Sequence, residues 1–184
     1  MHEQGDSDQA LRDCVERLRG TWLFDRGSAI DLEMLDFVVA EPREKINGKG
    51  ETIEVGDYAL HLQCGWRLTA PSGIVTGRSD VLEPDSEPAA FDYDEWDDVS
   101  NPPSRRNRRM NDFLAETSRD DRMVRSVRYL GFGAFAVAFP RHELIVLPSG
   151  TTTEDWRIFR PADDGAHTVC FAGGYARTTN DGVG

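Results

Sequence analysis

The sequence predicts an α+β fold, in which a curved, mostly antiparallel β-sheet of about seven to ten strands packs against an N-terminal helix and a central helix. Three observations predict it. Residues 57–69 alternate between apolar and polar types, which is typical of a strand with one buried face. Residues 9–19 carry apolar side chains at helical spacing. Residues 123–171 form short apolar runs separated by turns that contain Gly or Pro, as in an antiparallel meander.

The first helix is predicted over residues 9–19, after a tail at about residues 1–7 that we expect to be flexible. Ser7 or Asp8 would cap this helix, and Gly20 would end it. Its apolar side chains recur at i, i+3, i+4 and i+7 and would form one stripe: Leu11, Cys14, Val15 and Leu18.

Two strands are predicted next, over residues 21–24 and 29–39, with a turn at residues 25–28 between them. In the second strand, the alternation places Ile30, Leu32 and Met34 on the apolar side, against Asp31 and Glu33. Residues 40–51 are rich in charge and in strand-breaking residues, and we expect a loop with a turn at Asn47-Gly48.

The alternation over residues 57–69 gives the predicted central strand two distinct faces. The apolar face carries Tyr58, Leu60, Leu62, Cys64, Trp66 and Leu68. A four-residue turn would then return the chain antiparallel over residues 74–82, which places Gln63 opposite Asp80.

Residues 83–104 lack periodicity and are predicted to form a long acidic loop. The central helix would be capped by Asn101, with Pro102 at its first position, and would run to about Glu116. Its inward side chains would be Met110, Phe113 and Leu114. The basic start of this helix, residues 105–109, opposes the helix dipole, so we expect it to pair with the acidic loop.

The last third of the chain is predicted to supply five strands, separated by turns, before a tail at about residues 175–184 that we expect to be flexible. The strands are residues 123–130, 134–139, 144–147, 154–159 and 167–171. The length of 184 residues and the lack of any internal repeat favour a single domain over residues 1–184.

The net charge of the chain disfavours two classes of partner, nucleic acids and membranes. The formal net charge is −12, which disfavours duplex DNA and anionic lipid, so we expect neither nucleic acid nor a membrane as a partner. No apolar run approaches the ~20 residues of a membrane-spanning helix. The N-terminal segment also lacks the basic start and apolar stretch of a signal peptide.

The three cysteines indicate a cytoplasmic protein. Cys14, Cys64 and Cys170 are widely spaced and form no CxxC pair, so we expect reduced, mostly buried thiols and no structural zinc site. Three histidines are far apart and lack HxH or HExxH spacing: His61, His142 and His167. We therefore predict no metal site and no cofactor.

Several ordered blocks carry a resemblance that covers about residues 18–174. ALHLQCGWRL is followed by IVTGRSD, then FDYD, then EDWRIFRP ahead of HTVCFAGG. In this order the blocks resemble a family of small uncharacterised actinobacterial proteins, and the resemblance implies a single domain. It points to these motif positions: His61, Gln63, Trp66, Arg67, Asp80, Glu154, Trp156 and Arg157.

The polar face of the predicted central hairpin is the first candidate site, for a ligand. It would bring together His61, Gln63, Arg67, Arg78 and Asp80. His61 would act as a base with a pKa near neutrality, Asp80 would orient it, and Arg67 would hold an anion. The alternative is an ordinary sheet face with cross-strand polar pairs.

The acidic loop is the second candidate site, for a protein partner. Its charged and aromatic residues are interleaved: Asp92, Tyr93, Asp94, Trp96, Asp97 and Asp98. Aromatic anchors supply affinity and charges steer a partner, although two of the carboxylates would also suit a hydrolytic pair or a hard cation. The alternative is a solvated loop neutralised by the arginines at residues 105–109.

Two functional hypotheses follow. The first is a cytoplasmic binding protein whose acidic surface meets a basic or polar protein partner, as an inhibitor or immunity protein does. The second is a small-molecule-binding protein or an enzyme with a polar pocket around His61, Gln63, Arg67 and Asp80. The residue types alone leave open whether such a pocket would bind or catalyse.

Overall fold

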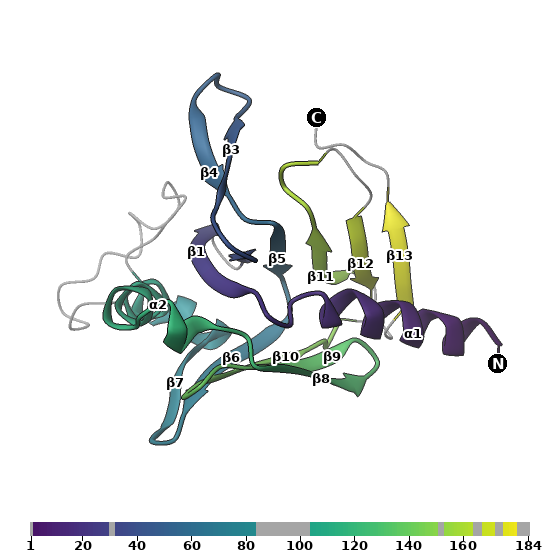
Figure 1. Cartoon of the computed structure of the whole chain (residues 1–184). Helices are drawn as coiled ribbons and strands as arrows, with labels where there is room; N and C mark the ends of the chain where they lie inside the picture. The colour runs from purple at the N-terminus through teal and green to yellow at the C-terminus, as the bar shows by residue number, and fades with distance from the viewer. Residues whose placement is uncertain are drawn as a thin grey trace.

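The computed structural model describes residues 2–29, 32–83, 104–150, 153–163, 167–171 and 175–179. Two antiparallel sheets pack on a shared core, with two helices that each contact strands of both sheets and a separate hairpin that projects from the body (Figure 1). This arrangement confirms the predicted α+β class. The helices are α1 (His2–Glu16) and α2 (Arg105–Glu116), with short 3-10 helices η1 (Arg78–Leu82) and η4 (Asp120–Arg122).

The strands are divided between the sheets as follows. The six-stranded sheet has the spatial order β1 (Trp22–Ala29), β2 (Leu32–Val38), β5 (Tyr58–Leu62), β11 (Glu154–Phe159), β12 (His167–Phe171) and β13 (Tyr175–Thr179). The five-stranded sheet has the order β7 (Gly73–Gly77), β6 (Gly65–Ala70), β10 (Glu143–Leu147), β9 (Ala134–Ala138) and β8 (Ser126–Gly131). The projecting hairpin pairs β3 (Arg43–Ile46) with β4 (Thr52–Val55).

The segment predicted as one central strand is two strands in different sheets. β5 ends at Leu62, β6 begins at Gly65, and between them the backbone N–H of Gln63 donates to the Asp155 carbonyl at 2.8 Å. The predicted apolar face is nevertheless buried: Leu60, Leu62, Cys64, Trp66 and Leu68 are at most 4% exposed. Because both sheets face the same core, the alternation continues through the crossing and does not reveal it.

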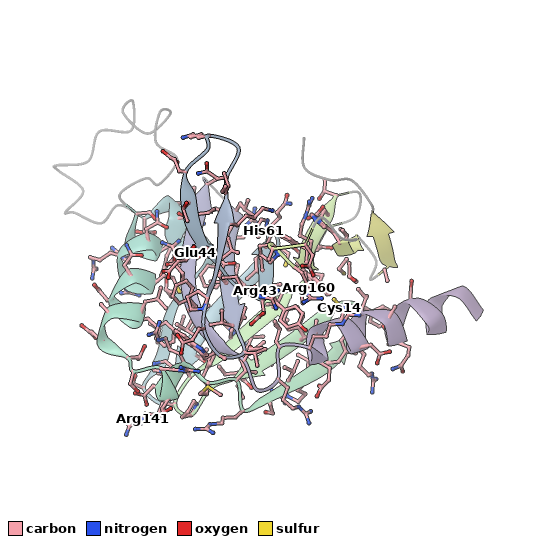
Figure 2. All side chains as sticks on the ribbon, turned by 45° about the horizontal axis from the view of Figure 1, so that its top comes forward. Cys14, Arg43, Glu44, His61, Arg141 and Arg160 are labelled. Carbon is pink, nitrogen blue, oxygen red and sulfur yellow. The ribbon has the colours of Figure 1, made fainter. Side chains whose placement is uncertain are left out.

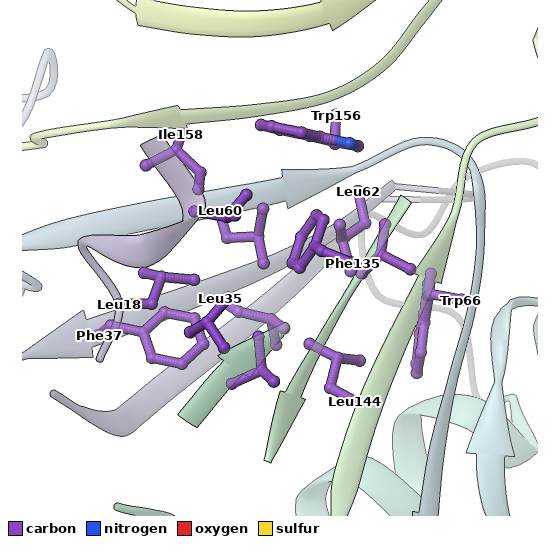
Figure 3. Close-up of a cluster of buried hydrophobic side chains, with 14 of the residues drawn as sticks. Leu18, Leu35, Phe37, Leu60, Leu62, Trp66, Phe135, Leu144, Trp156 and Ile158 are labelled. Carbon is purple, nitrogen blue, oxygen red and sulfur yellow. The ribbon is translucent and has the colours of Figure 1, made fainter. Parts of the chain in front are cut away.

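Side chains from the two sheets meet in this core (Figure 3). Leu60, Leu62, Trp156 and Ile158 come from the six-stranded sheet, and Trp66, Phe135 and Leu144 from the other. The indole of Trp156 is fully buried, with its ring centroid 5.2 Å from that of Phe135. Its Nε1–H donates to the Gly133 carbonyl at 2.8 Å, so this side chain joins the two sheets by packing and by a hydrogen bond.

Both ends of the chain hold regular elements where we expected flexible tails. Helix α1 begins at His2, so Ser7 and Asp8 lie within it and do not cap it. The Ser7 hydroxyl accepts from the Ala176 N–H of β13 at 3.0 Å, and the Asp8 carboxylate accepts from the Tyr129 hydroxyl at 2.5 Å. The predicted stripe of α1 is buried, and the helix lies against β8, β12 and β13 (Figure 1).

Strand β1 continues through residues 25–28, where a turn was predicted. The prediction was wrong because it treated Arg26 and Ser28 as polar turn residues. In the fold their side chains have buried hydrogen-bond partners, so the strand continues through them. The predicted faces of β2 are also reversed: Glu33 is fully buried, while Met34 lies on the other side. The predicted loop at residues 40–51 contains β3, although its turn at Asn47 is confirmed.

The return strand is shorter than predicted and its register differs. Arg67 pairs with Gly77 and Leu68 with Thr76, and an irregularity follows Leu68. Gly77 is required here, because a Cβ atom would lie 2.7 Å from the Trp66 carbonyl oxygen. Beyond β7 the chain forms η1 where a strand was predicted. The Thr76 hydroxyl of β7 donates to Asp80 Oδ2 of η1 at 2.9 Å, which links the strand to the 3-10 helix.

Helix α2 ends at Glu116, as predicted, but Ser104 is its N-cap, and its hydroxyl accepts from the Asn107 N–H at 3.3 Å. Asn101 and Pro102, expected at this position, lie outside the described residues. Of the five strands predicted as a meander, β8, β9 and β10 form one, whereas β11 and β12 belong to the other sheet. Strands β8 and β9 are joined by a turn at residues 131–133 in which all three residues have positive φ.

Candidate functional site

The five residues predicted to form a ligand site are not on one face. His61 is in β5 of the six-stranded sheet, and Gln63 follows directly after that strand. Arg67 is exposed on β6, whereas Arg78 and Asp80 lie in η1. The prediction assumed one hairpin, but the chain changes sheets after Leu62, so a spacing of two residues no longer keeps these groups together.

Gln63 and Asp80, predicted to be opposite each other, have different partners. Gln63 Nε2 donates to Glu154 Oε1 at 3.2 Å. Asp80 lies 3.6 Å from Arg109 Nη1, which belongs to α2. The candidate site is thereby divided into a group around His61 and a group around η1.

The group around His61 forms a polar and aromatic cluster on the side of the six-stranded sheet that faces away from the core. We call it the outer cluster; it comprises His61, Gln63, Glu154, Arg157, Phe159 and His167. The Phe159 ring stacks on His167 at 4.4 Å and meets the edge of His61 at 4.8 Å. Arg157 donates from Nε and Nη2 to the two Glu154 oxygens, each at 2.6 Å. This bidentate pair fixes the guanidinium.

His61 does not have the near-neutral pKa that we predicted for a base. Burial lowers its pKa to about 4, and the charges of Arg157 and His167 act in the same direction. The imidazole is therefore neutral at pH 7. Because Arg157 is already held by Glu154, the cluster consists of satisfied pairs rather than an activated acid or base.

We expect His61→Gln to reduce the acid sensitivity of the protein. The folded pKa of about 4 lies below the ordinary value of 6.5, so the stability that His61 contributes is present above 6.5 and lost as pH falls from 6.5 to 4. The fall in Tm between about pH 7 and about pH 4.5 should be smaller in the variant than in the wild type. An NMR titration should place the midpoint of the His61 ring near 4. Equal falls in Tm would contradict the assignment.

A second polar cluster is buried between α2 and the strands β1 and β2, and sequence reasoning missed it. Arg26 donates to Glu33 from Nε at 2.7 Å and from Nη2 at 2.9 Å. Arg106 Nε lies 3.4 Å from Glu33 Oε2, and both side chains are 0% exposed. Asn107 Oδ1 accepts from Arg26 and from the Ser28 hydroxyl. We call this group the buried arginine cluster; it attaches α2 to the sheet.

Burial and the neighbouring arginines act in opposite directions on the pKa of Glu33 in this cluster. Burial raises the pKa of the Glu33 carboxyl, while the hydrogen bond from Arg26 and the charges of Arg26 and Arg106 lower it. Two features of the sequence could have predicted this cluster. One is the run of polar residues inside a strand, and the other is Arg106, which lies four residues before Met110 and so on the inward side of α2.

The predicted acidic partner site at residues 92–98 lies outside the described residues, as does its expected pairing with the arginines of α2. Within the described part, Arg105 lies 3.6 Å from Glu83, and Arg108 lies 3.3 Å from Asp112. Arg109 also donates to the Val75 carbonyl at 2.8 Å, which holds α2 against β7.

The cysteines are free and buried, as predicted. Burial raises the pKa of Cys64 and of Cys170 to about 12, and the nearby Asp155 carboxylate contributes to each shift. Because the thiolate is the nucleophile, neither thiol is activated at neutral pH.

The projecting β3–β4 hairpin, which we call the arm, carries exposed aliphatic and acidic residues. Ile46 is 70% exposed near its tip. Glu44 and Glu54 are directly opposite each other across the two strands, and both are exposed (Figure 2 labels Glu44). Part-way along the arm, Lys45 Nζ donates to the Pro161 carbonyl at 2.6 Å, which ties the arm to the body.

Comparisons of the chain with protein-family models, curated proteins and solved structures find no match. The resemblance to the actinobacterial family thus stays a prediction. Across the described ranges, no group of three or more His, Cys, Asp or Glu side chains is placed to hold a metal ion. None of the helices described above is long and apolar enough to cross a membrane.

Proposed function

We propose that this chain is a cytoplasmic binding protein that holds a basic protein partner, in the manner of an inhibitor or immunity protein, and that the arm forms part of the contact surface. The observation that carries the proposal is the exposure of Ile46 next to the directly opposed Glu44 and Glu54. Neither nucleic acid nor a membrane is the partner in this proposal, because the net charge is −12.

The arm combines the two properties that a contact with a basic protein requires. Like charges that are directly opposite on neighbouring strands destabilise the pair, and a cationic side chain placed between Glu44 and Glu54 would relieve this repulsion. Ile46 supplies an apolar anchor on the same side of the ribbon, two residues from Glu44. The Lys45–Pro161 hydrogen bond and the Arg43–Asp57 ion pair hold the arm in place, so binding costs little ordering entropy.

The outer cluster favours binding over catalysis as well. His61 is neutral at pH 7, and Arg157 is engaged by the Glu154 carboxylate at two positions. A surface of satisfied polar pairs and a stacked aromatic ring suits recognition, whereas acid–base chemistry requires a group whose pKa lies near the working pH. The second hypothesis was a pocket around His61, Gln63, Arg67 and Asp80. It lacks this support because Arg67 and Asp80 belong to β6 and η1, whereas His61 and Gln63 belong to the outer cluster.

The test compares partner capture by three forms of the protein. The arm variant is Glu44→Lys with Glu54→Lys. The matched control is Glu116→Lys with Asp120→Lys, which gives the same change in net charge at exposed positions outside the arm. Crosslinked capture from the native cell supplies candidate partners, which are then purified and measured directly with each form.

We expect a basic protein that binds the wild type and the control equally and the arm variant at least about tenfold more weakly, with binding that weakens as salt rises. Equal binding by all three folded forms would overturn the role of the arm. Failure of every captured protein to bind the purified wild type directly would overturn the proposal as a whole.

A further inference from the structure

The tip of the arm contains the only Asn-Gly step in the sequence, Asn47-Gly48. This step lies in the turn between β3 and β4 (Figure 1). The Asn47 N–H donates to the Glu51 carbonyl at 2.9 Å, and the Gly50 N–H donates to the Asn47 carbonyl at 2.9 Å. The turn is therefore closed by its own backbone, with Asn47 at the position where β3 ends.

The side-chain amide of Asn47 is held in one orientation. Its Oδ1 accepts from the Lys49 N–H at 2.9 Å and from the Glu51 N–H at 3.0 Å. Its Nδ2 donates to Glu51 Oε2 at 2.9 Å. The two backbone donors make Cγ of this amide more electrophilic, because they stabilise the negative charge that develops on Oδ1 when a nucleophile adds to Cγ.

A nucleophile lies next to this amide in the chain, the backbone nitrogen of Gly48. Its N–H donates to no group in the described part of the chain, and Gly48 is exposed, so water and hydroxide reach it. Glycine has no side chain that would hinder the approach of its nitrogen to Cγ of the preceding residue. The turn therefore combines a polarised amide with an unhindered and accessible nitrogen.

We infer that Asn47 is a site of spontaneous deamidation in the folded protein. Hydroxide removes the Gly48 N–H proton, and the nitrogen forms a bond to Asn47 Cγ. The Cγ–Nδ2 bond then breaks, and ammonia leaves with a proton taken from water. Water opens the resulting succinimide at either carbonyl, which gives aspartate or isoaspartate at position 47. In total, one amide and one water give one carboxylate and one ammonium ion.

Both products change the tip of the arm. The new carboxylate replaces the amide that donates to Glu51, so two like charges are placed side by side. In the isoaspartate product the backbone also gains a methylene group, which disrupts the hydrogen bonds that close the turn. The reaction requires no partner, so it is independent of the proposed function although it occurs in the arm.

The test follows the purified, folded protein over time at mildly alkaline pH. Peptide mass analysis measures the conversion of each asparagine, and an enzymatic isoaspartate assay measures the second product. We expect Asn47 to convert at least about tenfold faster than Asn107 and Asn111, neither of which precedes a glycine. In ¹⁸O-labelled water, the product at position 47 should take up the label from the water that opens the succinimide.

Gly48→Ala is the decisive variant, because the backbone of Gly48 does not adopt positive φ and a Cβ atom there would meet nothing within 4 Å. The variant should keep the fold and slow the conversion of Asn47 at least about tenfold. The matched control is Lys49→Ala, which changes a side chain in the same turn and keeps the Asn-Gly step, so conversion should proceed at the wild-type rate.

Two results would overturn the proposal. One is an Asn47 that stays intact in the folded protein over a period in which the urea-unfolded chain converts. The other is conversion of the folded Gly48→Ala protein at the wild-type rate.

Discussion

Glu33→Ala is expected to lower the free energy of unfolding by about 3–5 kcal/mol, because it leaves two buried guanidinium groups without their shared carboxylate. Arg26 donates to Glu33 at two positions, and Arg106 lies on the second oxygen at 3.4 Å. Glu33 and Arg106 are both 0% exposed, so water does not replace the lost partner. Urea denaturation of the wild type and the variant measures the difference.

The triple variant Arg26→Met, Glu33→Leu and Arg106→Met provides the matched comparison. Replacing a whole buried ionic group with apolar residues of similar volume is often neutral or stabilising, so this variant should recover most of the loss. Its stability should therefore exceed that of Glu33→Ala. A Glu33→Ala protein as stable as the wild type would show that the cluster is open to solvent in solution.

Trp156→Ala should cost about 3–5 kcal/mol, the range found for large aromatic residues truncated in a core. The indole is fully buried, packs on Phe135 and donates a hydrogen bond to the Gly133 carbonyl in the turn between β8 and β9 of the other sheet. Trp156→Phe keeps part of the packing and loses the hydrogen bond, so its cost should be smaller. Chemical denaturation measures both values.

Ile74→Ala is the control for this series, because Ile74 is 63% exposed on β7 and its truncation should change stability by less than about 0.5 kcal/mol. A cost for Trp156→Ala as small as that of Ile74→Ala would contradict the assignment of Trp156 to the junction of the two sheets.

Alternation predicted which side chains are buried better than it predicted how strands are paired. From Leu60 to Leu68 the apolar positions are all buried, because burial depends only on which side of the backbone faces the core. The chain passes from one sheet to the other after Leu62, but the alternation does not change there because both sheets face the same core. Strand pairing depends on distant segments such as β11, which a local pattern does not identify.

Polar residues in the interior were the main source of error in the first 40 residues. Arg26 and Ser28 suggested a turn, and Glu33 suggested a solvent-facing side of β2, because charged residues are seldom buried. Their partners, Arg106 and Asn107, lie about 80 residues further along the chain, and only the folded chain brings them together. The residues of the candidate ligand site are separated for a related reason. The prediction placed them together by the register of one hairpin, but η1 replaces the end of its second strand.

The position of α1 has a consequence for the order in which the protein is made. This helix leaves the ribosome before the strands that cover its apolar stripe, β8, β12 and β13, which are translated much later. Until those strands emerge, the stripe stays open to other molecules, and a chaperone that recognises apolar helices has time to bind it. The pairing of β5 with β11 imposes a similar delay on the large sheet. The two sheets are therefore expected to complete their packing only once β13 has been made, rather than strand by strand from α1 onwards.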